Sequence, residues 1–257
     1  MPFISASAIS PYNSIRGGAA AGEGPSILDF APYNVWDSDS LSIVSTLTTA
    51  IDYNEVGAAY DLANPSPDNQ PTFNSSDTGA NGYPSLSFDG TTDYLINPVS
   101  NWRTSDSSGL IVFVAKYISG RYYALTTTDN ASTNYYLQQR VLANKFEFLI
   151  KGSGINDIYG STDVNDGNYH VIAYASTGSE YKMFVDGALE TINIQSGSNN
   201  GKWLSALIGT DSVAIGALYT PGITYSEIDW VFSGYFPYVD DATCIAISDI
   251  LKTKYNI

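Results

Sequence analysis

The sequence predicts a single all-β domain, a two-sheet antiparallel β-sandwich with an extended N-terminal arm and a short C-terminal helix. Short runs rich in Val, Ile, Tyr and Phe recur along the chain. Turn residues separate them at intervals of about 8–12 residues, which is typical of sandwiches. The 20 Tyr against 2 Met favour strands over helices. The length of 257 residues fits one sandwich, which we place at residues 27–257.

Residues 1–26 differ in composition from the rest and are predicted to form the extended arm. The segment is rich in Ser, Ala, Gly and Pro and has no sustained periodicity, which is typical of linkers. A disordered tail is the alternative, but a plain linker does not need isolated apolar anchors. Because the anchors are too few to form a core, we expect the arm to dock on another subunit or another protein. The arm residues expected to make that contact are Phe3, Ile4, Ile9, Tyr12, Ile15 and Arg16.

Strand signals begin weakly and become continuous after residue 84. The run 41–53 favours strand through its Thr, Val and Ile content, whereas residues 61–84 contain four prolines and indicate an irregular surface excursion. Asp89-Gly90 and Asp186-Gly187 are expected to be tight hairpin turns, because both central residues of such turns need positive φ. The remaining strand signals cover residues 85–88, 93–96, 110–118, 121–128, 134–141, 145–152, 168–176, 181–187, 212–218 and 230–239.

One helix is predicted at the C-terminus, over residues 242–255. Asp240 or Asp241 is a good N-cap for it, and the two lysines in its last turn suit the helix dipole. Cys244, Ile247 and Leu251 share one face of this helix, which we expect to be buried.

The charge balance excludes several classes of function. Charged residues are 14% of the chain and the formal net charge is −15, so the surface repels phosphate backbones and anionic membranes. No run approaches the roughly 18 apolar residues of a spanning helix, so neither nucleic-acid binding nor membrane insertion is expected. The single cysteine, Cys244, excludes an intrachain disulfide.

Several segments together resemble the concanavalin A-like and laminin G-like jelly-roll domains of bacterial and phage surface proteins. They are residues 60–74, 82–95, 166–176, 180–190, 213–218, 232–239 and 251–257. The resemblance covers roughly residues 35–257 and implies a jelly-roll sandwich that binds or assembles. It departs from the family at Tyr169, where Trp is common, and at 235–237. The arm segment 9–18 also resembles the N-termini of phage virion structural proteins.

Two features could support catalysis, and we expect neither to do so. Laminarinase-type glycosidases of this class use a Glu-x-Asp-x-x-Glu strand, and Glu227-Ile228-Asp229 resembles its start. The position of the acid/base holds Phe232, so one of the two carboxyls that retaining hydrolysis needs is missing. His170 is the only histidine, and we expect it to have a structural role.

Aromatic residues in polar loops are candidates for stacking on sugar rings, as in lectins of this class. The candidates are Trp102, Tyr122, Tyr135 and Trp203, with Tyr123 and Tyr136 beside them. Packing in the core is the alternative for each of them. The resemblance also admits a structural Ca²⁺ held by turn aspartates, and the alternative is that these are ordinary turn residues. They are Asp89, Asp93, Asp163, Asp166 and Asp186. We expect no other cofactor and no His/Cys metal site.

These observations predict a non-enzymatic phage virion structural protein, located in the virion as a head decoration, tail or fibre component. Its arm would join it to other virion proteins and to further copies of itself, and it would also contact a cell-surface glycan. The alternative is a carbohydrate-binding adhesin or lectin module. A glycoside hydrolase is the third hypothesis, which the missing acid disfavours. Fold class by itself does not decide between them.

Overall fold

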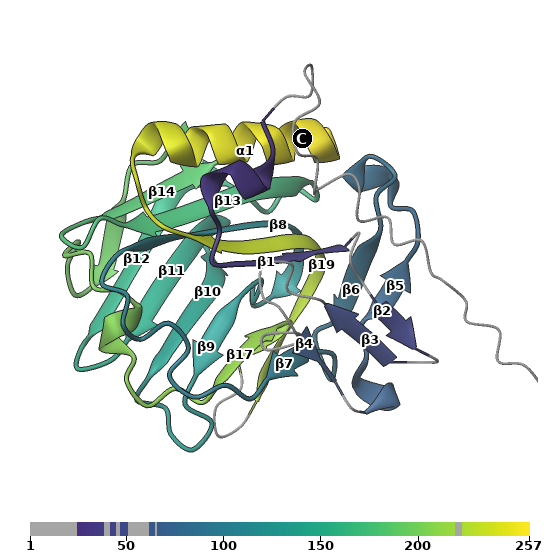
Figure 1. The fold of residues 1–257 in the computed structure, drawn as a ribbon, viewed down its shortest axis with the longest axis horizontal. Helices are drawn as coiled ribbons and strands as arrows, with labels where there is room; N and C mark the ends of the chain where they lie inside the picture. Colours follow the sequence, from purple (N-terminus) through teal and green to yellow (C-terminus); the bar gives the residue numbers. More distant parts are fainter. Residues whose placement is uncertain (1–24, 39–41, 45–46, 51–61, 65, 219–222) are drawn as a thin grey trace, which may run out of the picture.

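A computed structural model describes residues 25–38, 42–44, 47–50, 62–64, 66–218 and 223–257. Two antiparallel sheets lie face to face, and one long helix covers the outer side of the first sheet (Figure 1). The predicted all-β sandwich with a C-terminal helix is confirmed. Phe3, Ile4, Ile9, Tyr12, Ile15 and Arg16 of the predicted arm lie outside the described residues. The boundary between arm and domain therefore stays a prediction.

The first sheet has nine strands within the described residues, in the order β15-β14-β13-β8-β19-β6-β5, with β1 and β18 also paired to β19. Its centre is made by β8, which pairs with β13 on one side and with β19 on the other. The strands are β1 (Asn34–Asp37), β5 (Thr72–Asn74), β6 (Ser85–Asp89), β8 (Gly109–Gly120), β13 (Tyr169–Ser176), β14 (Tyr181–Val185), β15 (Ala188–Leu189), β18 (Ala217–Leu218) and β19 (Thr224–Phe236).

The second sheet has ten strands within the described residues, in the order β16-β12-β11-β10-β9-β17-β7-β4-β3-β2. Its strands are β2 (Ser42–Val44), β3 (Leu47–Ala50), β4 (Leu62–Ala63), β7 (Leu95–Asn97), β9 (Thr126–Thr128), β10 (Tyr136–Leu142), β11 (Lys145–Lys151), β12 (Ile155–Asp163), β16 (Asn193–Ser196) and β17 (Ser212–Ile215). The 3₁₀ turns are η1 (Ile27–Phe30), η3 (Pro67–Asn69), η4 (Thr78–Ala80) and η5 (Leu204–Ala206).

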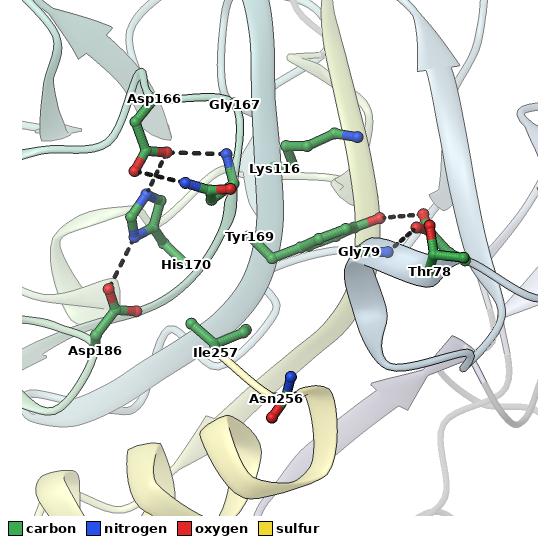
Figure 2. Close-up of a pocket in the computed structure, with 12 residues that line it drawn as sticks. Thr78, Gly79, Lys116, Asp166, Gly167, Tyr169, His170, Asp186, Asn256 and Ile257 are labelled. Atoms are coloured by element: carbon green, nitrogen blue, oxygen red, sulfur yellow. Dashed lines mark hydrogen bonds and ion pairs between the residues drawn. The ribbon is translucent and has the colours of Figure 1, made fainter.

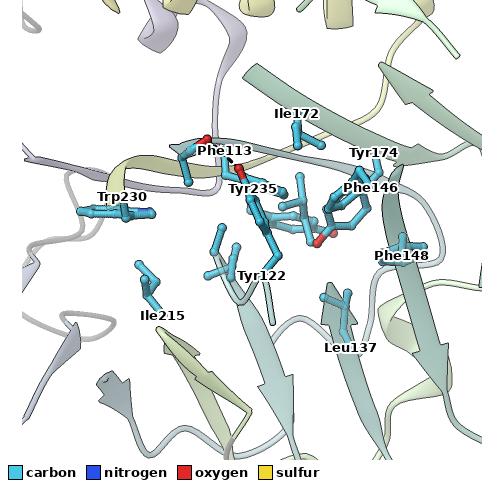
Figure 3. Packing of buried hydrophobic residues seen from close by; sticks show 14 of the residues in the cluster. Phe113, Tyr122, Leu137, Phe146, Phe148, Ile172, Tyr174, Ile215, Trp230 and Tyr235 are labelled. Atoms are coloured by element: carbon cyan, nitrogen blue, oxygen red, sulfur yellow. Dashed lines mark hydrogen bonds between the residues drawn. The ribbon is translucent and has the colours of Figure 1, made fainter. Parts of the chain in front are cut away.

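An aromatic core fills the space between the two sheets (Figure 3). Phe113 on β8 lies between Tyr122 and Phe146, with ring centroids 5.5 Å from each. The ring centroid of Phe148 on β11 lies 4.3 Å from that of Tyr174 on β13. Offset and edge-on aromatic pairs at such spacings add to the stabilisation that burial alone provides.

A second cluster lies between the outer side of the nine-stranded sheet and helix α1 (Asp241–Tyr255). The predicted face of Cys244, Ile247 and Leu251 is buried there, against apolar side chains of β8 and β13. Asp240 is the N-cap, and its side chain accepts a hydrogen bond of 2.7 Å from the Thr243 amide. Both helix predictions are therefore confirmed. Among the described residues, no helix combines the length and the hydropathy that a membrane crossing requires.

The two predicted hairpin turns have different outcomes. Asp186 and Gly187 have φ of 52° and 81° and join the paired strands β14 and β15, so this tight turn is confirmed. The prediction for Asp89-Gly90 is wrong, because β6 pairs with β5 and β19 while β7 pairs with β4 and β17. The chain crosses there from one sheet to the other, and the Asp89 carboxylate accepts hydrogen bonds from the amides of the next turn.

Other strand predictions need correction as well. Strand β12 was not predicted, because its polar residues and Gly160 weaken the apolar alternation. The run 121–128 forms a strand only at its end, in β9. The excursion over residues 61–84 contains the short elements β4, η3, β5 and η4. The run 41–53 contains β2 and β3, as its composition indicated.

Candidate functional site

Two polar surfaces could bind a ligand, and they lie on different sides of the sandwich. One is a pocket of about 510 Å³ beside the C-terminal end of α1, on the outer side of the nine-stranded sheet. Figure 2 shows Tyr169 and His170 of β13 in this pocket, together with Lys116 of β8 and Asn256. The other surface is the side of the ten-stranded sheet that faces away from the core.

His170 is held between two carboxylates in the first pocket (Figure 2). Its Nδ1 lies 2.9 Å from Asp186 Oδ2 and its Nε2 lies 3.1 Å from Asp166 Oδ1. Burial lowers the pKa of His170, but Asp186 and Asp166 outweigh that effect and raise the net pKa above its ordinary value. Asp186 also accepts the Val171 amide at 2.9 Å, and its carbonyl accepts Lys252 Nζ at 2.9 Å. His170 thus ties the β14–β15 turn to the loop before β13.

The other charged groups of this pocket are also paired. Tyr169 donates its hydroxyl to Asp77 Oδ2 at 2.7 Å, and Asp77 also accepts Ser85 Oγ at 2.8 Å. Lys116 Nζ lies 2.5 Å from Asp229 Oδ2. Burial and the bonded carboxylate raise the pKa of Tyr169 far above its ordinary value. Because these groups already satisfy one another, the pocket is better explained as a polar network that holds β8, β13 and η4 together.

We expect replacement of His170 by Gln to destabilise the protein at low pH more than at high pH. The raised pKa means that the folded state binds the proton more tightly than the unfolded state does. The stabilisation is complete below about pH 6.5 and is lost as the pH rises through the folded pKa. The expected loss is about 1–3 kcal/mol at pH 5.5 and clearly less at pH 9, as measured by urea unfolding. Equal losses at both values would mean that His170 is neutral when folded.

The second surface follows from the alternation of β10 and β11. Phe146, Phe148 and Ile150 point into the core, so the residues between them point to the opposite side of the sheet. We call this side the β10–β12 face. It consists of Tyr136, Gln138, Arg140, Leu142, Lys145, Glu147, Leu149, Lys151, Ile155, Asp157, Tyr159 and Asp163.

A buried ion triad forms the centre of the β10–β12 face. Arg140 Nη2 donates to Glu147 Oε1 and to Asp157 Oδ2, both at 2.8 Å, and Arg140 Nε also donates to Glu147. The Glu147 side chain is fully buried and that of Asp157 is 5% exposed. Burial and the adjacent Glu147 raise the pKa of Asp157 to about 7, against the opposing charge of Arg140. Two carboxylates thus face one guanidinium, and Asp157 Oδ1 has no hydrogen-bond partner among the described residues.

Around the triad, polar side chains of the face are left without partners. Within the described residues, the side-chain amide of Gln138 and the hydroxyls of Tyr136 and Tyr159 take part in no hydrogen bond of the protein. Lys151 Nζ lies 5.5 Å from the centre of the Tyr136 ring. Arg121 is exposed, and its backbone pairs with that of Arg140 in an isolated antiparallel β-bridge. Rings and unpaired polar groups on one surface are the usual components of a site for polar ligands. The β10–β12 face is therefore the better candidate site.

Three of the four aromatic residues expected to stack on sugars are in the core instead. Trp102, Tyr122 and Trp203 are 2%, 0% and 1% exposed. That prediction is wrong for them, because the packing between the sheets covers their rings. The Tyr122 hydroxyl donates to the Ala115 carbonyl at 2.6 Å, and the Trp203 indole N–H donates to Tyr235 at 3.1 Å. Tyr135 is half-buried just before β10, and its role stays a prediction.

The acids that resemble a glycosidase motif are bonded to other side chains of the protein, and Phe232 of the same motif lies apart from them. Glu227 accepts a hydrogen bond from Ser119, and Asp229 is bound by Lys116 and Ser87. Phe232 lies in the cluster beneath α1, after a bulge in the pairing of β19. These acids are on the outer side of the nine-stranded sheet, away from the β10–β12 face.

The turn aspartates proposed for calcium make local bonds. Asp163 accepts the Asn165 amide at 3.0 Å, while Asp166 and Asp186 bind His170. Burial and the neighbouring Asp89 raise the pKa of Asp93 to about 6. In the described part of the chain, no three His, Cys, Asp or Glu side chains gather into a metal-binding group. A structural Ca²⁺ stays a prediction.

Comparisons with known proteins agree with the fold. No protein-family model and no curated protein matches the chain. The solved structures include two of Trypanosoma rangeli sialidase. One, in complex with 2,3-difluoro-KDN, matches with a TM-score of 0.58 and 12% identity over 97% of this chain and 35% of that chain. The other matches with a TM-score of 0.55 and 13% identity over 86% of this chain and 32% of that chain. Ruminococcus gnavus IT-sialidase CBM40, bound to α2,6 sialyllactose, matches with a TM-score of 0.46 and 16% identity over 55% of this chain and 82% of that chain. At these identities the likeness concerns the fold alone.

Proposed function

We propose that the chain is a non-catalytic carbohydrate-binding module and that the β10–β12 face is its sugar-binding surface. The observation that supports this most is the gathering of unpaired polar groups beside exposed ring area on one side of one sheet. Tyr136 and Tyr159 are half-buried and offer flat apolar surface to a sugar ring. Gln138 follows Tyr136 on the same side of β10 and is 7% exposed, and its side-chain amide can both donate to and accept from hydroxyl groups.

The buried triad gives this surface its rigidity. Arg140 is bonded to side chains from both β11 and β12, so three neighbouring strands are linked beneath the rings. A sugar would therefore meet side chains whose positions are set before binding, which reduces the entropy lost on association. A non-catalytic role agrees with the placement of Glu227 and Asp229, whose carboxylates are engaged in the nine-stranded sheet.

Replacing Tyr136 with Ala is expected to weaken glycan binding about tenfold or more, because tyrosine is among the residues whose truncation at a binding surface costs over about 1 kcal/mol. Phe73 is the matched control, since it is a 37% exposed aromatic on β5 of the other sheet. Affinity electrophoresis against a panel of polysaccharides would measure the retardation of both variants. The same polysaccharides should release no reducing ends.

The location of the site would be refuted if Phe73→Ala and Tyr136→Ala lost retardation equally. Retardation of neither the wild type nor any variant would contradict the proposed function itself. Reducing ends released by the wild type, but not by a Glu227→Gln variant, would contradict the non-catalytic role.

The virion location and assembly through residues 1–26 stay predictions, because the contact residues of that arm lie outside the described part of the chain. Assembly through residues 1–26 and sugar binding by the β10–β12 face are compatible roles. A sugar-binding surface on the ten-stranded sheet leaves the helix side of the sandwich, where Pro25 lies beside Ile250 and Thr253, open to other contacts.

A further inference from the structure

We propose that the β10–β12 face selects anionic glycans, in which carboxylate or sulfate groups carry the charge. This inference rests on the proposed function and names the ligand class of the same site. It comes from the distribution of ion pairs over the described residues, which is uneven in a way that the net charge does not explain.

Cations are scarce in this chain, and most of them are paired. The sequence has 26 acidic residues against 11 Lys and Arg, all but Arg16 lying in the described residues. Six of these described cations form ion pairs with carboxylates, and they are Arg103, Lys116, Arg140, Lys182, Lys252 and Lys254. The other four described cations make no ion pair, although carboxylates are in excess.

The unpaired cations gather around one surface. Among the described residues, the Lys and Arg that make no ion pair are Arg121, Lys145, Lys151 and Lys202. Lys145 and Lys151 are at the two ends of β11 on the β10–β12 face. Arg121 pairs through its backbone with Arg140, so its side chain is on the same face. Lys202 Nζ lies close to Gly154, in the turn between β11 and β12. Three of these four cations thus belong to the β10–β12 face, where Lys151 is opposite Tyr136 and Lys145 is opposite Asp163.

The triad offsets part of the negative charge on this face, because one guanidinium is bonded to both of its carboxylates. Arg140 engages both oxygens of Glu147 and one oxygen of Asp157, while Asp157 Oδ1 has no hydrogen-bond partner among the described residues. An anionic substituent on a sugar would give Arg121 and Lys151 charge-assisted hydrogen bonds, which they do not make with the described residues of the protein. The net charge of −15 opposes non-specific binding of polyanions elsewhere on the surface. Recognition therefore depends on this local arrangement.

A glycan array tests the proposal if each carboxylated or sulfated glycan is printed beside its neutral counterpart, a galacturonate oligomer beside its methyl ester being one such pair. We expect the anionic member to bind about tenfold more tightly, as one or two charge-assisted hydrogen bonds would give. The carboxylated and sulfated arms identify which group supplies the charge. Calorimetry on the best pair then gives the ratio of affinities.

The double variant Arg121→Gln/Lys151→Gln should bring the two affinities together while binding of the neutral member persists. Lys182→Gln is the matched control, because Lys182 is a paired cation on β14 of the other sheet, and it should leave the ratio unchanged. Equal binding of both members by the wild type would overturn the charge preference but not the proposed function. Absence of binding to every glycan would overturn both.

Discussion

Replacing Arg140 with Ala is expected to lower the free energy of unfolding by about 3–5 kcal/mol at pH 8, because it leaves two buried carboxylates without their counter-charge. The Glu147 side chain is fully buried, and that of Asp157 is 5% exposed. Urea unfolding followed by tyrosine fluorescence and by circular dichroism would measure the loss.

Arg103→Ala is the matched control for this prediction. The two arginines are equally exposed, at 26%, but the partner of Arg103, Asp106, is 16% exposed and also accepts a hydrogen bond from Tyr235. Its removal should cost about 1 kcal/mol or less. If both substitutions cost the same, the buried triad is not what stabilises the β10–β12 face.

The cost of Arg140→Ala should also decrease at low pH. The pKa of Asp157 is already raised to about 7 in the folded protein, and loss of Arg140 raises it further. A carboxyl whose folded pKa is raised contributes stability that is present below its unfolded pKa, about 4, and lost as the pH rises through the folded value. The variant should therefore be closest to the wild type near pH 4–5.

Gly216→Ala is expected to destabilise the protein by roughly 2–5 kcal/mol through two independent costs. Gly216 has φ of 84° and joins β17 to β18. A Cβ there would overlap the Phe88 ring and lie 3.1 Å from the Asp93 carbonyl oxygen. Phe88 is 2% exposed in the core, so its ring has no free space to enter.

Gly120→Ala separates the two costs. Gly120 has a similar φ of 72°, but a Cβ at this position would have nothing within 4 Å. It should cost only the roughly 1–2 kcal/mol of the left-handed backbone. Thermal and urea unfolding of both variants would give the difference. Equal losses would mean that the core around Phe88 adapts to the added methyl group.

The candidate site shows why sequence reasoning selected the wrong aromatic residues. Trp102 and Trp203 are in segments that look polar, yet the fold brings them under the nine-stranded sheet, where Tyr235 contacts both. The useful signal was in the run 145–151, where charged residues at 145, 147 and 151 alternate with apolar ones at 146, 148 and 150. This alternation indicates a strand with one buried face and one polar face. It does not say which partners the polar face acquires.

The local features of this protein follow from short stretches of its sequence. Alternation and β-branched or aromatic content specified most strands, Asp240 specified the start of α1, and Asp186-Gly187 specified one hairpin. Each of these depends on residues close together in the chain, where steric preference and hydrogen-bonding capacity decide the conformation.

Which distant residues contact one another depends on the packing of the whole fold. Strand β8 lies between β13 and β19, and Asp89-Gly90 crosses between sheets instead of turning back. Arg140, Glu147 and Asp157 come together because three strands align in one register. Sheet order and register result from burying the whole core at once, a global balance that no short segment encodes. The same packing covers Trp102 and Trp203, and it leaves Arg121 and Lys151 with no ion pair to any carboxylate of the described residues.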